Sequence, residues 1–144
     1  MKFVNPAPEQ IAALLGSART IAVVGLSDNP SRPSFDVAKA LQKYGYRIVP
    51  VSPTIAEWLD IPAFATLTEA VAGLGPSHPI DIVNVFRRPE HVDAIVDECI
   101  HLDLPALWLQ MGVINEPAAL RAQQADMTVI MDKCIKVERM RLTQ

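Results

Sequence analysis

The chain of 144 residues has the length of one ordinary domain; half of its residues are hydrophobic and only 6% are aromatic. Its net charge of −3 provides no global field that would attract nucleic acid or an anionic membrane, and we expect neither as a partner. The sequence shows no apolar run of membrane-spanning length and no signal peptide, so we expect a cytoplasmic protein. Cys99 and Cys134 are too widely spaced to indicate a disulfide framework or a zinc site with paired ligands.

Apolar runs of strand length alternate with helical patterns along the chain. In chain order, we expect a helix at 8–15, a strand at 20–24, a helix at 37–44, a strand at 47–51, a short strand at 63–64, a helix at 67–72, a strand at 81–86, a helix at 90–101, a strand at 106–109, a helix at 118–125, a strand at 128–131 and a helix at 135–140. This alternation indicates βαβ crossovers and therefore a parallel sheet. We predict a single α/β domain over residues 1–144, with a Rossmann-like doubly wound, mainly parallel sheet of five or six strands and helices on both faces.

A polar loop and a pair of arginines, each a candidate for binding a ligand, follow two strands that we expect to be neighbours. Ligands of open parallel sheets bind beyond the carboxyl ends of the strands, where the winding direction reverses. The loop 25–34 follows the first strand: it opens on Gly25, carries three serines and Arg32, and leads into a helix whose N-terminus would favour a phosphate. Arg87 and Arg88 follow the strand at 81–86. An ordinary polar loop and a solvated arginine pair are the competing interpretations.

The pattern differs from that of a nicotinamide dinucleotide site. Such a site has three glycines in G-x-G-x-x-G spacing and an acidic residue about twenty positions later, at the end of the second strand. Here Gly25 is followed by no further glycine until Gly45, and the second strand is followed by Ser52 and Pro53. The sequence therefore disfavours NAD and NADP, although the predicted fold would accept either.

Four blocks of the sequence, in order, resemble the family of stand-alone coenzyme A (CoA) binding proteins, which is similar to the CoA-binding domain of the succinyl-CoA ligase alpha subunit. The blocks are residues 22–34, 81–88, 106–113 and 131–136. The resemblance implies that CoA or acyl-CoA is the small-molecule ligand. The arginines of the two segments are suited to this ligand. CoA carries a 3′-phosphate in addition to its diphosphate, and a guanidinium group binds phosphate oxygens in pairs.

The resemblance also implies roles for residues at the carboxyl ends of the strands. These are Gly25, Ser27, Arg32 and Ser34 for the diphosphate, Ser52 and Pro53 for the adenosine side, Phe86, Arg87 and Arg88 for the nucleotide and its 3′-phosphate, and Gln110 and Gly112 for the pantetheine arm. The chain departs from the family pattern in two places. Ser52 stands where asparagine is expected, and residues 57–62 lack the usual glycine turn.

No nucleophile–base pair, convergent carboxylates or metal-ligand cluster is evident in the sequence, so we predict a CoA-binding protein without catalytic residues. One alternative is a component of an acyl-CoA-handling enzyme or of a split CoA ligase, which would require an unidentified protein partner. A second is a redox protein that uses Cys134, because this cysteine follows the last strand at the ligand end of the sheet. A packed or unreactive thiol is the competing interpretation of Cys134, and a nicotinamide-binding reductase is the last alternative.

Overall fold

Five parallel strands form the central sheet of the computed structural model, which describes residues 2–142. The strands are β1 (Thr20–Val24), β2 (Arg47–Val51), β5 (Ile82–Val85), β6 (Ala106–Leu109) and β7 (Thr128–Met131). They lie in the order β2-β1-β5-β6-β7, so β1 and β5 are neighbours near the middle of the sheet. Four strands have the predicted bounds, and β5 is one residue shorter at each end than the predicted strand at 81–86.

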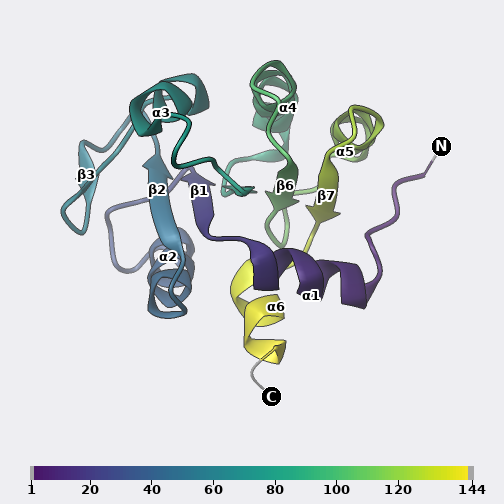
Figure 1. Ribbon diagram of the computed structural model, residues 1–144, viewed down its shortest axis with the longest axis horizontal. Helices are drawn as coiled ribbons and strands as arrows, with labels where there is room; N and C mark the ends of the chain where they lie inside the picture. The colour runs from purple at the N-terminus through teal and green to yellow at the C-terminus, as the bar shows by residue number, and fades with distance from the viewer. Residues whose placement is uncertain (1, 143–144) are drawn as a thin grey trace.

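Helices cover both faces of this sheet, as Figure 1 shows. On one face lie α1 (Pro8–Ser17), α2 (Pro33–Lys43) and α6 (Ile135–Arg141), and on the other lie α3 (Leu67–Leu74), α4 (Val92–His101), which follows a 3-10 turn at Pro89–His91, and α5 (Glu116–Gln124). Successive strand side chains point to opposite faces, so each layer of helices encloses its own apolar core. The predicted doubly wound α/β architecture is confirmed. Within residues 2–142, no helix has both the length and the apolar character needed to cross a membrane.

Helix α2 begins four residues before its predicted start at residue 37. Pro33 occupies its first turn, where the fixed φ of proline suits a helix and the missing N–H would have no intrahelical partner. The periodicity of apolar residues did not reveal this turn because it contains Ser34 and Asp36. The earlier start brings Ser34 into the helix, so the loop after β1 ends directly at a helix N-terminus.

A short hairpin lies beside the β2 edge of the sheet. It consists of β3 (Glu57–Trp58) and β4 (Ile61–Pro62), joined by a two-residue turn. Leu59 and Asp60 both have positive φ, at 46° and 65°, so the turn that lacks the family's glycine is formed by two residues in the left-handed conformation. The strand predicted at 63–64 is reduced to a single bridge between Phe64 and the end of β2.

The opposite edge strand, β7, is covered by the N-terminal segment. The Asn5 side chain donates to the Met131 carbonyl oxygen at 3.0 Å and accepts from the Met131 N–H at 2.8 Å. One amide side chain thus makes the hydrogen bonds that a neighbouring strand would make. Because an uncovered edge strand promotes pairing between chains, this contact protects the sheet.

Candidate functional site at the carboxyl edge of the sheet

The reversal of winding lies between β1 and β5. From β1 the chain passes to β2 on one side, and it returns to β5 on the other side of β1. Gly25, directly after β1, has φ of +85°, and a Cβ on it would lie 2.4 Å from the Phe86 carbonyl oxygen and 2.8 Å from Arg87 Cδ. The position therefore requires glycine for its conformation and for the close approach of the segment after β5. The two segments singled out in the sequence do meet at this edge.

The loop between β1 and α2 is held in shape by its own side chains. The Ser27 N–H donates to Ser34 Oγ at 3.0 Å, and the Asn29 N–H donates to Ser27 Oγ at 3.1 Å. Asn29 Oδ1 accepts from both the N–H and the hydroxyl of Ser31, at 3.0 and 2.9 Å. The two serines assigned to the diphosphate accept backbone hydrogen bonds with their oxygens, which leaves each hydroxyl hydrogen able to donate to a ligand.

The N-terminus of α2 faces the same edge and lacks a side-chain cap. Arg32 occupies the N-cap position without capping the helix, so the first-turn amides are not satisfied by a side chain there. The first turn also contains Asp36, but Lys136 Nζ lies 2.8 Å from its carboxylate. The hydrogen bond to Asp36 raises the pKa of Lys136. The negative charge in this turn is thus offset by α6, and the helix terminus retains its preference for an anion.

Two adjoining cavities lie at this edge, of about 530 and about 280 Å³. They share Gly25, Ser27 and Phe86, so they flank one stretch of loop backbone. The smaller cavity is lined in addition by Arg32, Pro33 and Ser34. The larger is lined in addition by Leu26, Asp28, Ser52, Pro53, Thr54, Ile55, Arg87, Arg88 and His91. Nine of the eleven residues predicted for the site therefore line one cavity or the other.

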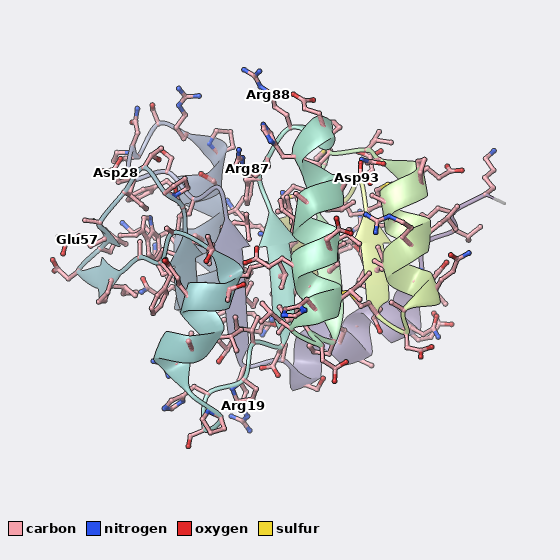
Figure 2. All side chains as sticks on the ribbon, turned by 90° about the horizontal axis from the view of Figure 1, so that it is seen from above. Arg19, Asp28, Glu57, Arg87, Arg88 and Asp93 are labelled. Carbon is pink, nitrogen blue, oxygen red and sulfur yellow. The ribbon has the colours of Figure 1, made fainter. Side chains whose placement is uncertain are left out.

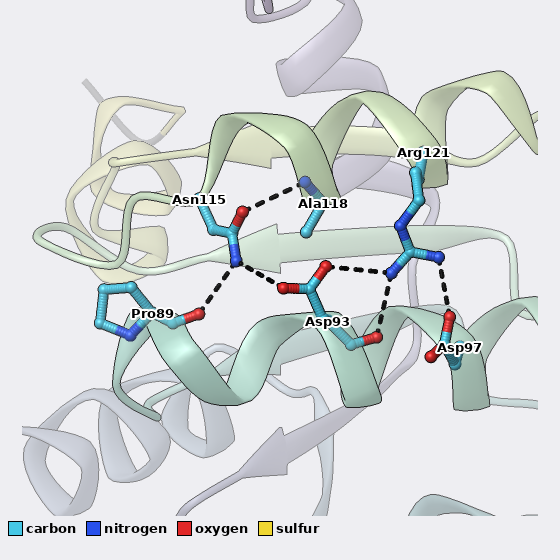
Figure 3. Close-up of polar contacts among 6 residues, drawn as sticks. All are labelled: Pro89, Asp93, Asp97, Asn115, Ala118 and Arg121. Atoms are coloured by element: carbon cyan, nitrogen blue, oxygen red, sulfur yellow. Dashed lines mark hydrogen bonds and ion pairs between the residues drawn. The ribbon is translucent and has the colours of Figure 1, made fainter.

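The arginines of these cavities have no protein partner. Within residues 2–142, Arg32, Arg87 and Arg88 form no side-chain hydrogen bond or ion pair. Figure 2 shows Arg87 and Arg88 together at one end of the strands. Arg121 on α5 contrasts with them, because its guanidinium binds Asp93 at 3.2 Å and Asp97 at 2.7 Å, as drawn in Figure 3.

Ser52 and Pro53, which the sequence assigns to the adenosine side, follow β2 and line the larger cavity. Ser52 is only 5% exposed, and its N–H donates to the Phe64 carbonyl oxygen at 2.8 Å. Its Oγ lies 3.0 Å from Thr54 Oγ1. The serine that replaces the family's asparagine is thus fixed by the β2 edge and pairs with a second hydroxyl.

Gln110 and Gly112 lie at the carboxyl end of β6 but line neither cavity. Gln110 is 5% exposed, and its Oε1 accepts the Ile135 N–H at 2.9 Å. The Gly112 N–H donates to Asp132 Oδ1 at 2.8 Å, so this amide is already engaged. The structure places Gln110 beside the start of α6 and Gly112 beside Asp132, after β7, and neither lines a cavity with the other nine.

Sequence reasoning missed several residues of the site. Asp28, Ile55 and His91 line the larger cavity, and His91 is an exposed residue at the N-cap of α4. Asn84 lies in β5 with no exposed surface, and neither its Oδ1 nor its Nδ2 has a hydrogen-bond partner. The sequence does show a polar residue within the apolar run Ile82–Val85. Because buried polar groups nearly always have partners, an asparagine at such a position could have been recognised as a candidate binding residue.

A doubly wound parallel sheet with a capless helix terminus and unpaired arginines at its switch point defines a Rossmann-like α/β protein with a candidate anion site. Within the described part of the chain, no cluster of three or more histidine, cysteine or acidic side chains is arranged to hold a metal ion. The model of the CoA-binding domain family matches residues 19–140, and the chain belongs to that family.

Known proteins of similar sequence and structure cover almost the whole chain. The uncharacterised protein YneT of Bacillus subtilis is 46% identical over 133 residues, which are 92% of this chain and 94% of YneT. The structure of cell-free ID.343 from Thermus thermophilus is 35% identical, with a TM-score of 0.82 over 95% of this chain and 99% of that one. A hypothetical protein from Pyrococcus horikoshii is 26% identical, with a TM-score of 0.86 over the full length of both chains.

Proposed function

We propose that this protein binds CoA or acyl-CoA in the groove formed by the two carboxyl-edge cavities. The observation that carries the proposal is the set of three unpaired arginines, Arg32, Arg87 and Arg88, around the uncapped N-terminus of α2. CoA carries a diphosphate and a 3′-phosphate, and its charge matches this group of cations. Charge-assisted hydrogen bonds from arginine to phosphate are among the stronger polar contacts in proteins.

The smaller cavity is assigned to the diphosphate. Gly25 allows the loop backbone to approach the ligand, and the hydroxyls of Ser27 and Ser34 are free to donate to it. The Ser34 N–H in the first turn of α2 and the guanidinium of Arg32 complete the set of donors, since the Phe35 and Asp36 N–H groups already donate to the Arg32 carbonyl oxygen. All of these groups donate, as an anion with only acceptor oxygens requires.

The larger cavity is assigned to the adenosine and its 3′-phosphate. Ser52 and Pro53 form one wall, while Phe86 supplies an aromatic surface on the segment after β5. Arg87 and Arg88 lie in the same cavity and are assigned to the 3′-phosphate. Nicotinamide dinucleotides share the diphosphate but lack the 3′-phosphate, because NAD has no third phosphate and NADP carries its third phosphate on the 2′ position.

The pantetheine arm is assigned to the path past Gln110 and Gly112. The two residues lie at the end of β6, on the side of the groove where α6 begins. The proposal assigns binding to this groove, in a cytoplasmic protein, and assigns no reaction to the residues that line it.

Calorimetric titration of the reduced protein with CoA tests the proposal. We expect saturable binding of one CoA per chain and much weaker binding of NAD under the same conditions. Folding of the sample is checked by circular dichroism before the titration. A folded protein that shows no saturable binding at millimolar CoA, or that prefers NAD, would overturn the assignment.

A further inference from the structure

The thiol of Cys134 lies where three parts of the fold meet. Cys134 is partly exposed and immediately precedes α6. The residue after it, Ile135, donates its N–H to Gln110 at the end of β6. Lys136 on the first turn of α6 pairs with Asp36 on the first turn of α2, at 2.8 Å. The start of α6, with its cysteine, is therefore fixed beside the start of α2, which is the proposed diphosphate site.

Two primary amides beside this segment have unused hydrogen-bonding groups. Gln110 uses its Oε1 for Ile135, and no partner of its Nε2 occurs among the described residues. Asn84, one strand away, has no partner at either amide atom. Asn84 is in register with Trp108, and the Trp108 indole donates to the Lys133 carbonyl oxygen at 2.8 Å. Residues in register share a face of a parallel sheet, so Asn84 lies on the face that Lys133 and Cys134 cover.

These amides match the chemistry of a pantetheine arm. An unsatisfied polar group in a protein interior costs about 1–3 kcal/mol, so it indicates a function that repays the cost. Among the described residues only the Asn84 amide and Trp58 Nε1 are buried without a partner, and of the two only Asn84 lies in the central sheet. The pantetheine arm contains two amide groups, each with one donor and one acceptor, and it ends in a thiol. Primary amides of Gln110 and Asn84 supply both kinds of partner. Cys134 is the residue between Lys133, which accepts from Trp108, and Ile135, which donates to Gln110.

We infer that Cys134 forms a mixed disulfide with the CoA thiol end by thiol–disulfide exchange with oxidised CoA, the symmetrical CoA disulfide. This inference rests on the proposed function, because the proposed groove must bind one of the two CoA moieties of the CoA disulfide. The Cys134 thiol loses its proton to water, and the thiolate attacks the nearer sulfur of the CoA disulfide. A protein–CoA disulfide bond forms, the CoA–CoA disulfide breaks, and the second CoA leaves as a thiolate that takes up a proton. Cys134 is oxidised and one CoA is reduced.

Cys99 provides an internal control for this chemistry. It has no exposed surface, and burial raises the pKa of its thiol to about 12. Only the thiolate attacks a disulfide, so Cys99 is inert near neutral pH. The chain thus contains one thiol near the proposed ligand site, on Cys134, and one unreactive thiol in the core, on Cys99.

Intact-mass spectrometry without reductant tests the inference. The reduced protein is incubated separately with CoA disulfide and with oxidised glutathione, and the rate of adduct formation is measured for each. We expect one CoA adduct per chain, formed about ten times faster or more than the glutathione adduct because binding raises the local concentration of the CoA disulfide. The adduct should persist in Cys99→Ala and be lost in Cys134→Ser.

Each other outcome contradicts the inference. Equal rates with the two disulfides would make Cys134 a merely exposed thiol, and a missing adduct or one on Cys99 would exclude the exchange. Calorimetry of the wild-type protein with CoA, in reductant, separates this failure from failure of the proposed function. Normal CoA binding without an adduct in the wild type would overturn the inference alone, whereas loss of all CoA binding by the wild type would overturn both.

Discussion

The two ends of the central sheet carry cavities of similar size, but they differ in the polar side chains that the fold buries beside them. The amino-edge cavity, of about 500 Å³, lies between the ends of α3 and α4 and has mainly apolar walls that include Val71, Ile80 and Leu104. Asp81 and Asp103 also line it, and the Asp81 carboxylate already accepts the N–H groups of Arg19 and Thr20, at 2.8 and 2.9 Å. A second amino-edge cavity, of about 460 Å³, is more polar and is lined by Arg19, Arg47 and Asp81, among others. The carboxyl-edge cavities combine three arginines with serine hydroxyls and the uncapped N-terminus of α2.

The distribution of buried polar residues shows the same difference. Five polar residues are buried in the described chain, and only Thr20 lies at the amino edge. The other four, toward the carboxyl edge, are Ser34, Ser52, Asn84 and Gln110. The fold places costly polar groups where ligands of open α/β sheets bind, and it uses the amino edge for packing. Neither size nor the presence of arginines would distinguish these cavities, whereas the buried polar side chains do.

Gly25→Ala should have the largest effect on CoA binding. A methyl group would collide with the Phe86 carbonyl oxygen and Arg87 Cδ, and the left-handed φ would add about 1–2 kcal/mol of strain. We expect CoA affinity to fall by about 100-fold or more, measured by calorimetry. Gly75→Ala at the amino edge is the matched control, since Gly75 has φ of +74° but open space around it. Similar losses of affinity in both variants would show that strain, not the groove, controls binding.

Arg32→Ala should weaken CoA binding by about 2 kcal/mol, or roughly 30-fold, because one charged donor to the diphosphate is lost. Arg19→Ala serves as the control at the amino edge, where Figure 2 shows Arg19 far from Arg87 and Arg88. Calorimetry at fixed ionic strength measures both. If Arg32→Ala binds CoA as the wild type does, the diphosphate lies elsewhere.

Asn84→Leu should change stability and affinity in opposite directions. Removal of an unpaired buried amide should raise the free energy of unfolding of the free protein by about 1–2 kcal/mol. The same change should lower CoA affinity by about tenfold if the amide binds the pantetheine arm. Denaturant unfolding and calorimetry on one preparation give both values. A less stable free protein would mean that the amide has a structural role.

Arg121→Ala should have the smallest effect. Its ion pairs with Asp93 and Asp97 are on the surface between α4 and α5, and such pairs contribute about 1 kcal/mol or less. We expect a small loss of stability in urea unfolding and unchanged CoA affinity. A loss of CoA binding comparable to that of Arg32→Ala would show that the paired and unpaired arginines are not functionally distinct.

The sequence predicted the sheet well because each strand is an apolar run bounded by polar residues, and the observed β1, β2, β6 and β7 have the predicted bounds. It missed the start of α2, where proline and serine conceal a helical turn from apolar periodicity. It placed the loop after Gly25 and the arginines after β5 at one edge, but the collision of a Cβ at Gly25 with Phe86 depends on tertiary contacts. The separation of Gln110 from the cavities likewise follows from its bond to Ile135, 25 residues away in sequence.

A nitrogen-15 NMR titration of the reduced protein with CoA tests the central claim most directly, because backbone amides report which edge the ligand contacts. The account predicts that the largest chemical-shift changes occur in residues 25–34 and 86–88, with further changes at Gln110 and Gly112. It also predicts little change around Val71, Ile80 and Leu104 at the amino-edge cavity. Shifts concentrated at the amino edge, with residues 25–34 unaffected, would contradict it.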